Sequence, residues 1–312
     1  MPSGSRPVRV IEVPASTPGR ALLIHGGANG RVPYLDALGQ GTYAEGLQAA
    51  YLAGETVLHR DGQCVDAVCA AVCALEDDPV FNCGRGAALT AAGHAELDSA
   101  VMRGDGVGGA VIASRHARHP VLLARAVLER SEHVILSDPP ESLVREWGLE
   151  VADPEWFVTD ARRAELADVL AQRAAANRHG TVGAVTLDGR GHLAAATSTG
   201  GIVAQATGRV GDSPILDAGT FACDGVVAVS CTGEGEAFLQ GVVSHDVYAR
   251  MAYGHAPLAD AVRATLEQQV GGRGAFGGII ALAADGTMVV ASNADTMFAA
   301  WRGPEGVIVL TE

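Results

Sequence analysis

The sequence lacks long apolar runs and contains few aromatic residues. Phe, Trp and Tyr make up 4% of the 312 residues, and no segment approaches the length of a membrane-spanning helix. The opening segment MPSGSRPVRV is polar and basic, without the apolar stretch of a signal peptide. The sequence therefore predicts a cytoplasmic protein that does not enter a membrane.

Clusters of basic residues are also absent. The formal net charge is −14, and no run of Lys or Arg is longer than a pair. Nucleic acids and anionic membrane surfaces repel a chain of this charge. We therefore exclude both as partners, and any cationic contact with a substrate must be local.

The six cysteines form neither a CxxC pair nor a Cys/His metal pattern. Cys69 and Cys73 stand four positions apart in an Ala/Val-rich stretch with a helical pattern, where a thiol acts as a small core residue. Because the cytoplasm keeps cysteines reduced, we expect free thiols rather than disulfides.

Glycine is abundant, with 40 residues, and small apolar side chains accompany it. This composition suits a tightly layered enzyme, and 312 residues are enough for a sizeable core. No Pro/Ser-rich spacer or low-complexity tract separates two cores. We therefore predict a single domain over residues 1–312.

The order of apolar patterns predicts an α+β protein in which helices lie outside sheets. A capping box that begins at Thr42 indicates the start of the first helix. Further helices are expected over residues 65–75, 120–130, 235–254 and 258–269, with a surface helix or a connection over 160–178. Strands are expected near residues 21–27, 95–102, 109–114, 133–136 and 225–231. Two hairpins are expected, one from strands 181–187 and 193–199 with a turn at Asp188-Gly189, and one over residues 278–293.

A candidate nucleophile lies at His179-Gly180-Thr181, where an Ala/Arg/Glu-rich segment meets a buried strand. A threonine hydroxyl is a poor nucleophile without an adjacent base, and a free α-amine with a pKa of about 8 on the same residue is such a base. An internal Thr181 lacks that amine. Attack of its hydroxyl on the Gly180 carbonyl, followed by hydrolysis of the ester, would create the catalyst.

A Gly-Thr pair alone is typical of any loop that meets a β-branched strand residue, so the hypothesis depends on three downstream motifs. The first, STGG at residues 198–201, ends the strand that pairs with the one after Thr181. Across a hairpin, a hydroxyl of this motif can reach Thr181. The alternative is an ordinary turn.

The other two motifs suggest groups that bind a substrate. In GRVGDSP, Arg209 and Asp212 offer a guanidinium and a carboxylate to the α-groups of an amino acid, unless they form a surface ion pair. In CTGEG at residues 231–235, a hydroxyl and backbone N–H groups at a strand-to-helix junction suit an oxyanion. By itself this last motif is a weak Gly-rich turn.

Taken in order, HGTVGAV, ATSTGG, GRVGDSP and SCTGEGE resemble the plant-type (type III) L-asparaginase and isoaspartyl peptidase family. IHGGA, LEDDPVFNCGRG, ELDSAVM and HPVLLARAVLER resemble the first subunit of that family, so the resemblance spans nearly the whole chain. It implies a four-layer αββα sandwich of the N-terminal-nucleophile (Ntn) hydrolase type. It also implies autoproteolysis into an α subunit (1–180) and a β subunit (181–312), assembled as the homo-oligomer (αβ)2.

The implied activity is hydrolysis of the side-chain amide of L-asparagine and of β-aspartyl dipeptides, through a β-aspartyl ester and without a cofactor. By motif, Thr181 is the nucleophile and, through its amine, the base. Thr199 bonds its hydroxyl, and Thr232 and Gly233 form the oxyanion hole. Asn82 supports the site from the first subunit.

The resemblance also assigns a substrate subsite. Arg209 binds the α-carboxylate and Asp212 the α-ammonium, with the backbone of Gly233 and Gly235 assisting. The loop before Asn82 resembles the alkali-metal loop of the family, in which carbonyl oxygens hold a structural sodium ion.

Several positions depart from the family pattern. Residues 202–207 read IVAQAT where the family usually has a run similar to MTNK and a proline, so contacts at the pocket rim are expected to differ. Arg103 stands where an aspartate is common, and the connection before Thr181 is short. His25 is expected to be structural because the amine already supplies a base, and His179 would leave with the tail of the α subunit.

Two other functions fit the same residues. A glycosylasparaginase would use the same nucleophile and differ in how it accommodates the leaving group. An uncleaved, inactive relative would only bind amino acids.

Overall fold

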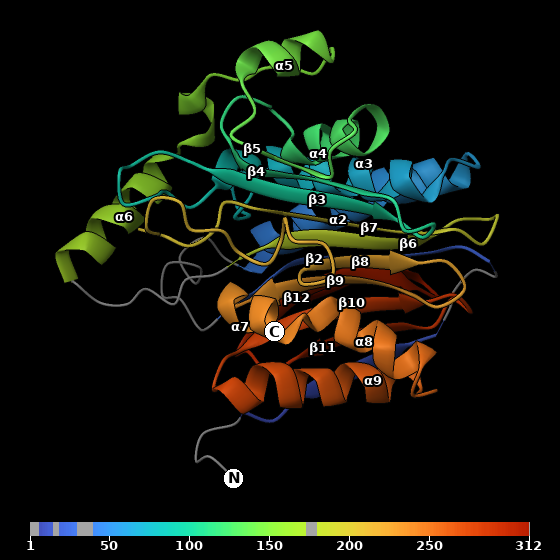
Figure 1. The fold of residues 1–312 in the computed structure, drawn as a ribbon. Coiled ribbons are helices and arrows are strands. Elements are labelled where there is room, and N and C mark those ends of the chain that lie inside the picture. Colours follow the sequence, from blue (N-terminus) through green and yellow to red (C-terminus); the bar gives the residue numbers. More distant parts are fainter. Residues whose placement is uncertain (1–5, 15–18, 30–39, 173–179, 312) are drawn as a thin grey trace.

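The computed structural model describes residues 6–14, 19–29, 40–172 and 180–311. Two β-sheets face each other at the centre of the molecule, and helices cover their outer faces (Figure 1). This is the α+β arrangement that the sequence predicts. His179 lies outside the described residues.

The larger sheet has eight strands in the order β13-β12-β2-β6-β7-β3-β4-β5. Its neighbouring strands are antiparallel except β4 and β5, which are parallel. The strands are β2 (Ala21–Asn29), β3 (Leu97–Arg103), β4 (Gly108–Ser114), β5 (Ile135–Ser137), β6 (Val182–Leu187), β7 (Leu193–Thr199), β12 (Thr296–Gly303) and β13 (Gly306–Thr311).

The smaller sheet is antiparallel, with the order β1-β11-β10-β9-β8. It joins the start of the chain to its last third, because β1 pairs with β11. The strands are β1 (Arg9–Val13), β8 (Thr220–Cys223), β9 (Val227–Gly233), β10 (Gly277–Ala283) and β11 (Met288–Ser292).

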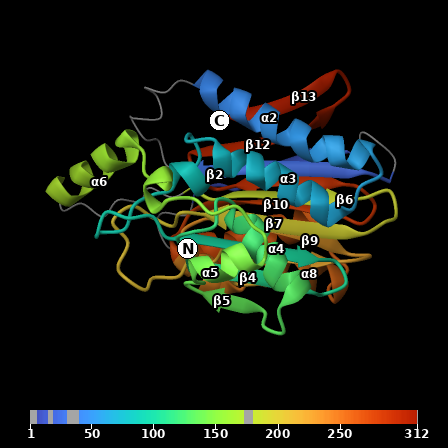
Figure 2. The ribbon, with the colours of Figure 1, turned by 90° about the horizontal axis from the view of Figure 1, so that it is seen from above.

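Helices α2, α3 and α4 lie on the outer face of the larger sheet (Figure 2), and α7, α8 and α9 lie on the outer face of the smaller one (Figure 1). Helices α5 and α6 belong to the long connection between β5 and β6, and α6 projects from the body of the protein. The helices are α2 (Gln40–His59), α3 (Cys64–Asp77), α4 (Pro120–Arg130), α5 (Glu141–Glu146), α6 (Asp160–Gln172), α7 (Gly235–Gly241), α8 (Val243–Ala252) and α9 (Leu258–Thr265). Short helical turns cover Gly84–Gly86, Pro154–Phe157, Leu266–Val270 and Gly271–Arg273.

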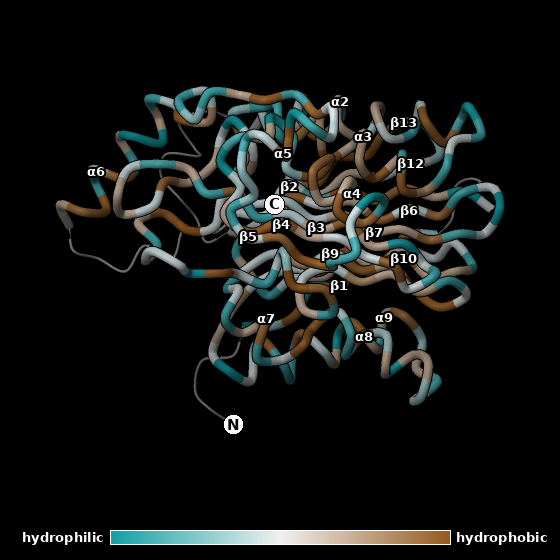
Figure 3. The backbone as a smooth tube through the Cα atoms, turned by 45° about the horizontal axis from the view of Figure 1, so that its top comes forward, coloured by the Kyte–Doolittle hydropathy of each residue, from teal (hydrophilic) through white to brown (hydrophobic). Residues whose placement is uncertain are grey.

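Strand β2 contributes to two hydrophobic cores. Leu23 belongs to the core between the sheets, together with Ile280 of β10. Its neighbours Leu22 and Ile24 belong to the core beneath the helices, together with Leu47 of α2. Successive side chains of a strand point to opposite faces, so a continuous apolar run can serve both cores. Figure 3 shows the hydrophobic segments concentrated in the stacked strands.

The structure bears on two expectations from the sequence, free thiols and the lack of a membrane-spanning helix. All six cysteines lie in the described ranges and carry free thiols, and Cys64, Cys69, Cys83 and Cys231 are buried. Within the described part of the chain, no helix is both long and apolar enough to cross a membrane.

The helix predicted over residues 235–254 is two helices. Val242 separates α7 from α8 and has φ 46° and ψ 51°, in the left-handed region that β-branched residues rarely adopt. Both helices pack against β9 or its neighbours, so the apolar pattern continues through the break. Hydrophobic periodicity alone therefore cannot reveal this interruption.

The first helix begins earlier than predicted, and several strands were missed. Helix α2 starts at Gln40, so Thr42 lies inside it and the capping-box prediction is wrong. Strands β1, β8, β12 and β13 are absent from the sequence prediction. Strand β8 is short, and β1 and β13 lie at sheet edges, where partial exposure weakens the apolar pattern. Strand β12 is buried between β13 and β2, so neither reason applies to it.

Gly109 in β4 allows the backbone of α4 to lie directly on the sheet. A Cβ there would lie 2.8 Å from Leu128 Cα and still closer to two backbone atoms of α4.

We expect Gly109→Ala to lower the free energy of unfolding by about 1–3 kcal/mol, because neither backbone can yield without repacking. Thermal unfolding measures this change. Gly272→Ala is the control, since its Cβ meets only Glu267 O at 3.5 Å; equal destabilisation by both variants would contradict the close packing.

Candidate active site

The Gly180–Thr181 junction is buried at the start of β6, with 5% of Thr181 exposed. In the β6–β7 hairpin Val182 pairs with Ser198, so Thr181 and Thr199 are next to each other across the strands. The Thr181 hydroxyl donates to Thr199 Oγ1 over 3.3 Å. The hairpin therefore brings together the two threonines that the sequence singled out.

The carbonyl oxygen of Gly180 accepts two hydrogen bonds. Thr199 Oγ1 donates to it over 3.0 Å and Asn82 Nδ2 over 2.7 Å. Donors aimed at a carbonyl oxygen polarise the bond and stabilise negative charge that develops there. This carbonyl is the one that the Thr181 hydroxyl would attack.

Asn82 is held rigidly by three contacts. Its Oδ1 accepts from the backbone N–H of Ala88 at 2.6 Å, and its Nδ2 also donates to the Gly201 carbonyl at 2.7 Å. With the bond to Gly180, both donors and the acceptor of the amide are used. The loop after α3 thus places one side chain between two glycines of the second half of the chain.

Gly27 of β2 lies against the same junction. Its φ is +116°, and a Cβ there would lie 3.3 Å from Gly180 Cα and 3.5 Å from Thr181 N. Glycine at position 27 therefore permits a close approach between β2 and this junction, and β2 continues past it to Asn29.

The end of β9 carries the predicted oxyanion residues. Thr232 is fully buried, and its Oγ1 accepts from the backbone N–H of Ala28 over 3.1 Å. Gly233 has φ +143° and faces Gly277, whose Cα would lie 2.5 Å from an added Cβ. Ala28 follows Gly27 in β2. Its hydrogen bond to Thr232 therefore links the smaller sheet to the part of β2 that lies against Thr181.

Arg209 and Asp212 meet at Gly235. A Cβ on Gly235 would lie 3.0 Å from Arg209 Nη2 and 2.9 Å from Asp212 Oδ1. Asp212 is buried, and its Oδ2 has no hydrogen-bond partner among the described residues. Burial raises the pKa of Asp212 to about 7. An unsatisfied carboxylate beside a guanidinium suits a zwitterionic ligand.

Arg209 is paired with Glu236, a residue that sequence reasoning missed. Nε lies 3.0 Å from Glu236 Oε1, and Nη2 lies 3.2 Å from Oε2. The sequence offered two interpretations, a subsite for α-groups or a surface ion pair. The structure contains an ion pair on one edge of Arg209 and an unpartnered carboxylate at Asp212 beside it.

His25 is buried, and its Nε2 lies 2.9 Å from Ser230 Oγ. Desolvation lowers the pKa of His25 to about 3, so the ring is neutral at physiological pH. Ser230 Oγ lies 2.8 Å from Thr197 Oγ1 in turn. This environment agrees with the structural role predicted for His25, and Ser230 and Thr197 were not anticipated.

Glu76 is another unanticipated buried residue near the site. Ser198 donates to its Oε1 over 2.6 Å, and the backbone N–H of Val121 donates over 3.0 Å. Burial raises the pKa of Glu76 to about 8. Glu76 thereby fixes the residue that precedes Thr199.

Carbonyl oxygens gather in the loop before Asn82. Those of Pro79 and Phe81 both point to the position that a Cβ on Gly86 would occupy, and that of Glu76 approaches Gly84. Only glycine leaves room for this arrangement. Oxygen-rich loops of this kind suit hard cations such as sodium.

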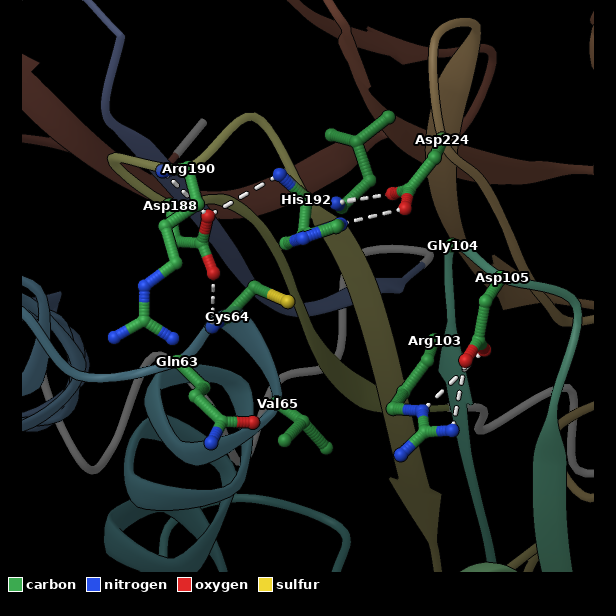
Figure 4. Close-up of a pocket in the computed structure, with 11 residues that line it drawn as sticks. Gln63, Cys64, Val65, Arg103, Gly104, Asp105, Asp188, Arg190, His192 and Asp224 are labelled. Atoms are coloured by element: carbon green, nitrogen blue, oxygen red, sulfur yellow. Dashed lines mark hydrogen bonds and ion pairs between the residues drawn. The ribbon is translucent and has the colours of Figure 1, made fainter.

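A separate cavity of about 260 Å³ lies at the other end of the β6–β7 hairpin (Figure 4). Asp188 accepts there from the backbone N–H groups of Cys64 and His192, over 3.2 and 3.1 Å. Asp224 accepts from His192 Nδ1 over 2.8 Å and from the N–H of Leu193 over 2.7 Å. These carboxylates hold the hairpin turn, and we assign them a structural role.

Comparison with known proteins agrees with this geometry. A sequence model of the asparaginase family matches residues 18–310. The chain is 40% identical to an isoaspartyl peptidase of Escherichia coli, over 91% of this chain and 93% of the relative. It is also 40% identical to an isoaspartyl peptidase of Salmonella typhimurium, over 83% and 87%. A probable isoaspartyl peptidase/L-asparaginase of Arabidopsis thaliana is 35% identical, over 90% and 94%. The chain therefore belongs to the isoaspartyl peptidase/L-asparaginase family.

Proposed function

We propose that this protein hydrolyses the side-chain amide of L-asparagine and the β-aspartyl bond of isoaspartyl dipeptides. The observation that carries the proposal is the buried Thr181 hydroxyl, bonded to Thr199, at a peptide whose carbonyl accepts two hydrogen bonds. The names of the relatives from E. coli and A. thaliana support the same substrates. A cytoplasmic location is part of the proposal.

The first step is cleavage of the chain itself. The Thr181 oxygen attacks the carbonyl carbon of Gly180, while Asn82 and Thr199 donate to the carbonyl oxygen as it becomes negative. The C–N bond breaks, the hydroxyl proton passes to the Thr181 nitrogen, and Gly180 becomes an ester on Oγ1. Water hydrolyses this ester, leaving a Gly180 carboxylate and a free Thr181 amine.

Processed Thr181 then acts on the substrate. Its amine accepts the hydroxyl proton as Oγ1 attacks the β-carbonyl carbon. The Thr232 hydroxyl and the Gly233 N–H stabilise the oxyanion; Thr232 Oγ1 accepts from Ala28, so its own hydrogen can be donated. The leaving amine takes the proton from the Thr181 ammonium. Water cleaves the β-aspartyl ester and releases L-aspartate.

The pair at Gly235 holds the two α-groups of the substrate. Arg209 binds the α-carboxylate and Asp212 the α-ammonium. Asp212 Oδ1 faces Gly235 beside Arg209, and the buried Oδ2 has no hydrogen-bond partner among the described residues, so the carboxylate has the capacity to accept from the ammonium. Both substrates carry these α-groups and differ only in the leaving amine, so one subsite serves both.

The finer architecture is also part of the proposal. We assign the helix-covered sheet pair to a four-layer αββα Ntn-hydrolase sandwich, a single domain processed into residues 1–180 and 181–312 and assembled as (αβ)2. Carbonyl oxygens of the loop before Asn82, where those of Pro79 and Phe81 both face Gly86, would hold a sodium ion that braces the loop. The chemistry itself needs no cofactor.

Replacing the nucleophile tests both steps. Thr181→Ala is expected to remain a single chain on denaturing electrophoresis and to lose more than about 10³-fold in asparagine turnover, because it has no hydroxyl. Thr186→Ser, on the same strand, is expected to be processed and active because its hydroxyl is kept.

Three outcomes would contradict the proposal. Normal turnover by Thr181→Ala would remove Thr181 as the nucleophile. An intact, inactive wild-type chain would favour the relative that only binds amino acids. Turnover of glycosyl-asparagine without turnover of isoaspartyl-alanine would favour a glycosylasparaginase.

The pKa of Asp212 predicts a substrate-specific pH dependence. Only the carboxylate form binds an ammonium, and with a pKa of about 7 this form is lost as the pH falls. From about pH 8 to about pH 6, kcat/KM for L-asparagine should fall about tenfold more than kcat/KM for succinamate, which lacks the ammonium. Titration of the Thr181 amine affects both substrates equally, so it cancels in the ratio. A ratio that does not change with pH would exclude Asp212 as the ammonium partner.

A further inference from the structure

The guanidinium of Arg209 is held along one edge. Its Nε and Nη2 donate to the two carboxylate oxygens of Glu236, the parallel arrangement that fixes the plane of a guanidinium most firmly. The Arg209 side chain is 12% exposed, whereas Glu236 is 58% exposed. Glu236 therefore contacts Arg209 from the solvent side and leaves the buried side clear.

A second group restrains the same guanidinium. Arg209 Nη1 donates to Gln205 Oε1 over 3.4 Å. Gln205 is buried, and its Oε1 also accepts from the backbone N–H of Ile202 over 3.2 Å. This residue belongs to the segment 202–207, where the sequence departs from the usual family pattern.

The terminal nitrogens of Arg209 face the subsite. Nη1 lies 3.2 Å from the Cβ position of Gly211, and Nη2 lies 3.0 Å from that of Gly235. A guanidinium has five N–H groups, and Glu236 and Gln205 engage three of them. One N–H remains on each terminal nitrogen without a partner among the described residues, as a bidentate carboxylate contact requires.

We propose that Glu236 is a positioning residue that orients Arg209 so that its free N–H groups face the α-carboxylate of the substrate. The inference rests on the proposed function. Glu236 and the substrate would bind different edges of one guanidinium, so Glu236 does not have to leave when substrate enters. Its negative charge is largely solvated, which limits its repulsion of the substrate carboxylate.

Charge neutralisation alone does not explain Glu236. Asp98 and Asp212 are buried carboxyl groups whose pKa values the nearby Arg209 charge lowers against the larger raising effect of burial. Arg209 therefore already has two acidic neighbours. What Glu236 adds is the two-point contact that sets the direction of the guanidinium.

The test is steady-state kinetics of processed Glu236→Ala and Glu236→Gln with L-asparagine and with 3-aminopropanamide, the same amide without the α-carboxylate. For Glu236→Ala we expect KM for asparagine to rise about tenfold or more while kcat changes less than about twofold, since the lost contact orients a binding group. The inhibition constant of L-aspartate should rise in parallel. Turnover of 3-aminopropanamide should not change.

Two variants keep this result interpretable. Glu236→Gln retains one acceptor oxygen and should fall between wild type and Glu236→Ala. Glu141→Gln removes the charge from another exposed Glu–Arg pair, on α5, and should match wild type in every constant.

Each contrary result has its own meaning. A lower KM in Glu236→Ala would show that Glu236 competes with substrate for Arg209, and equal losses on both amides would show a general structural role; either overturns the inference. An unchanged KM for asparagine in Glu236→Ala would also overturn the inference. Wild-type protein without asparaginase activity would instead overturn the proposed function, and the inference with it.

Discussion

The site depends on a single hydroxyl, that of Thr199. Its oxygen accepts from the Thr181 hydroxyl and from the N–H of Gly201, and it donates to the Gly180 carbonyl. One atom thereby contacts the proposed nucleophile, the carbonyl that it would attack and the turn that follows. This is possible only in the observed register of β6 and β7, because a shift by one residue would move the Thr199 side chain to the other face of the sheet.

The smaller sheet is tied to the same point by buried hydroxyls. Thr197 of β7 bonds Ser230 of β9, and Ser230 bonds His25 of β2. A neutral histidine suits this position, because it shares hydrogen bonds without placing a charge between the sheets. Two residues beyond Ser230, Thr232 bonds the end of β2. These bonds therefore hold the sheets where the proposed nucleophile and the proposed oxyanion donors can meet.

Local sequence patterns predicted the α+β class and a hairpin in which a hydroxyl of the STGG motif reaches Thr181, and the family resemblance assigned that contact to Thr199. They could not predict that Glu76 would bond Ser198 or that Glu236 would bond Arg209, since those contacts join separate elements after packing. The break at Val242 was equally hidden, because the apolar pattern continues across it. Sequence thus indicated candidate reacting groups, but not the residues that contact and orient them.

In the proposed mechanism, Thr181 becomes catalytic only as a chain terminus. The most direct measurement follows freshly purified wild-type protein over time, with intact mass and asparagine turnover recorded on the same samples. We expect activity to rise in proportion to the fraction of molecules cleaved between Gly180 and Thr181. Full activity in samples that contain only the uncleaved chain would contradict it.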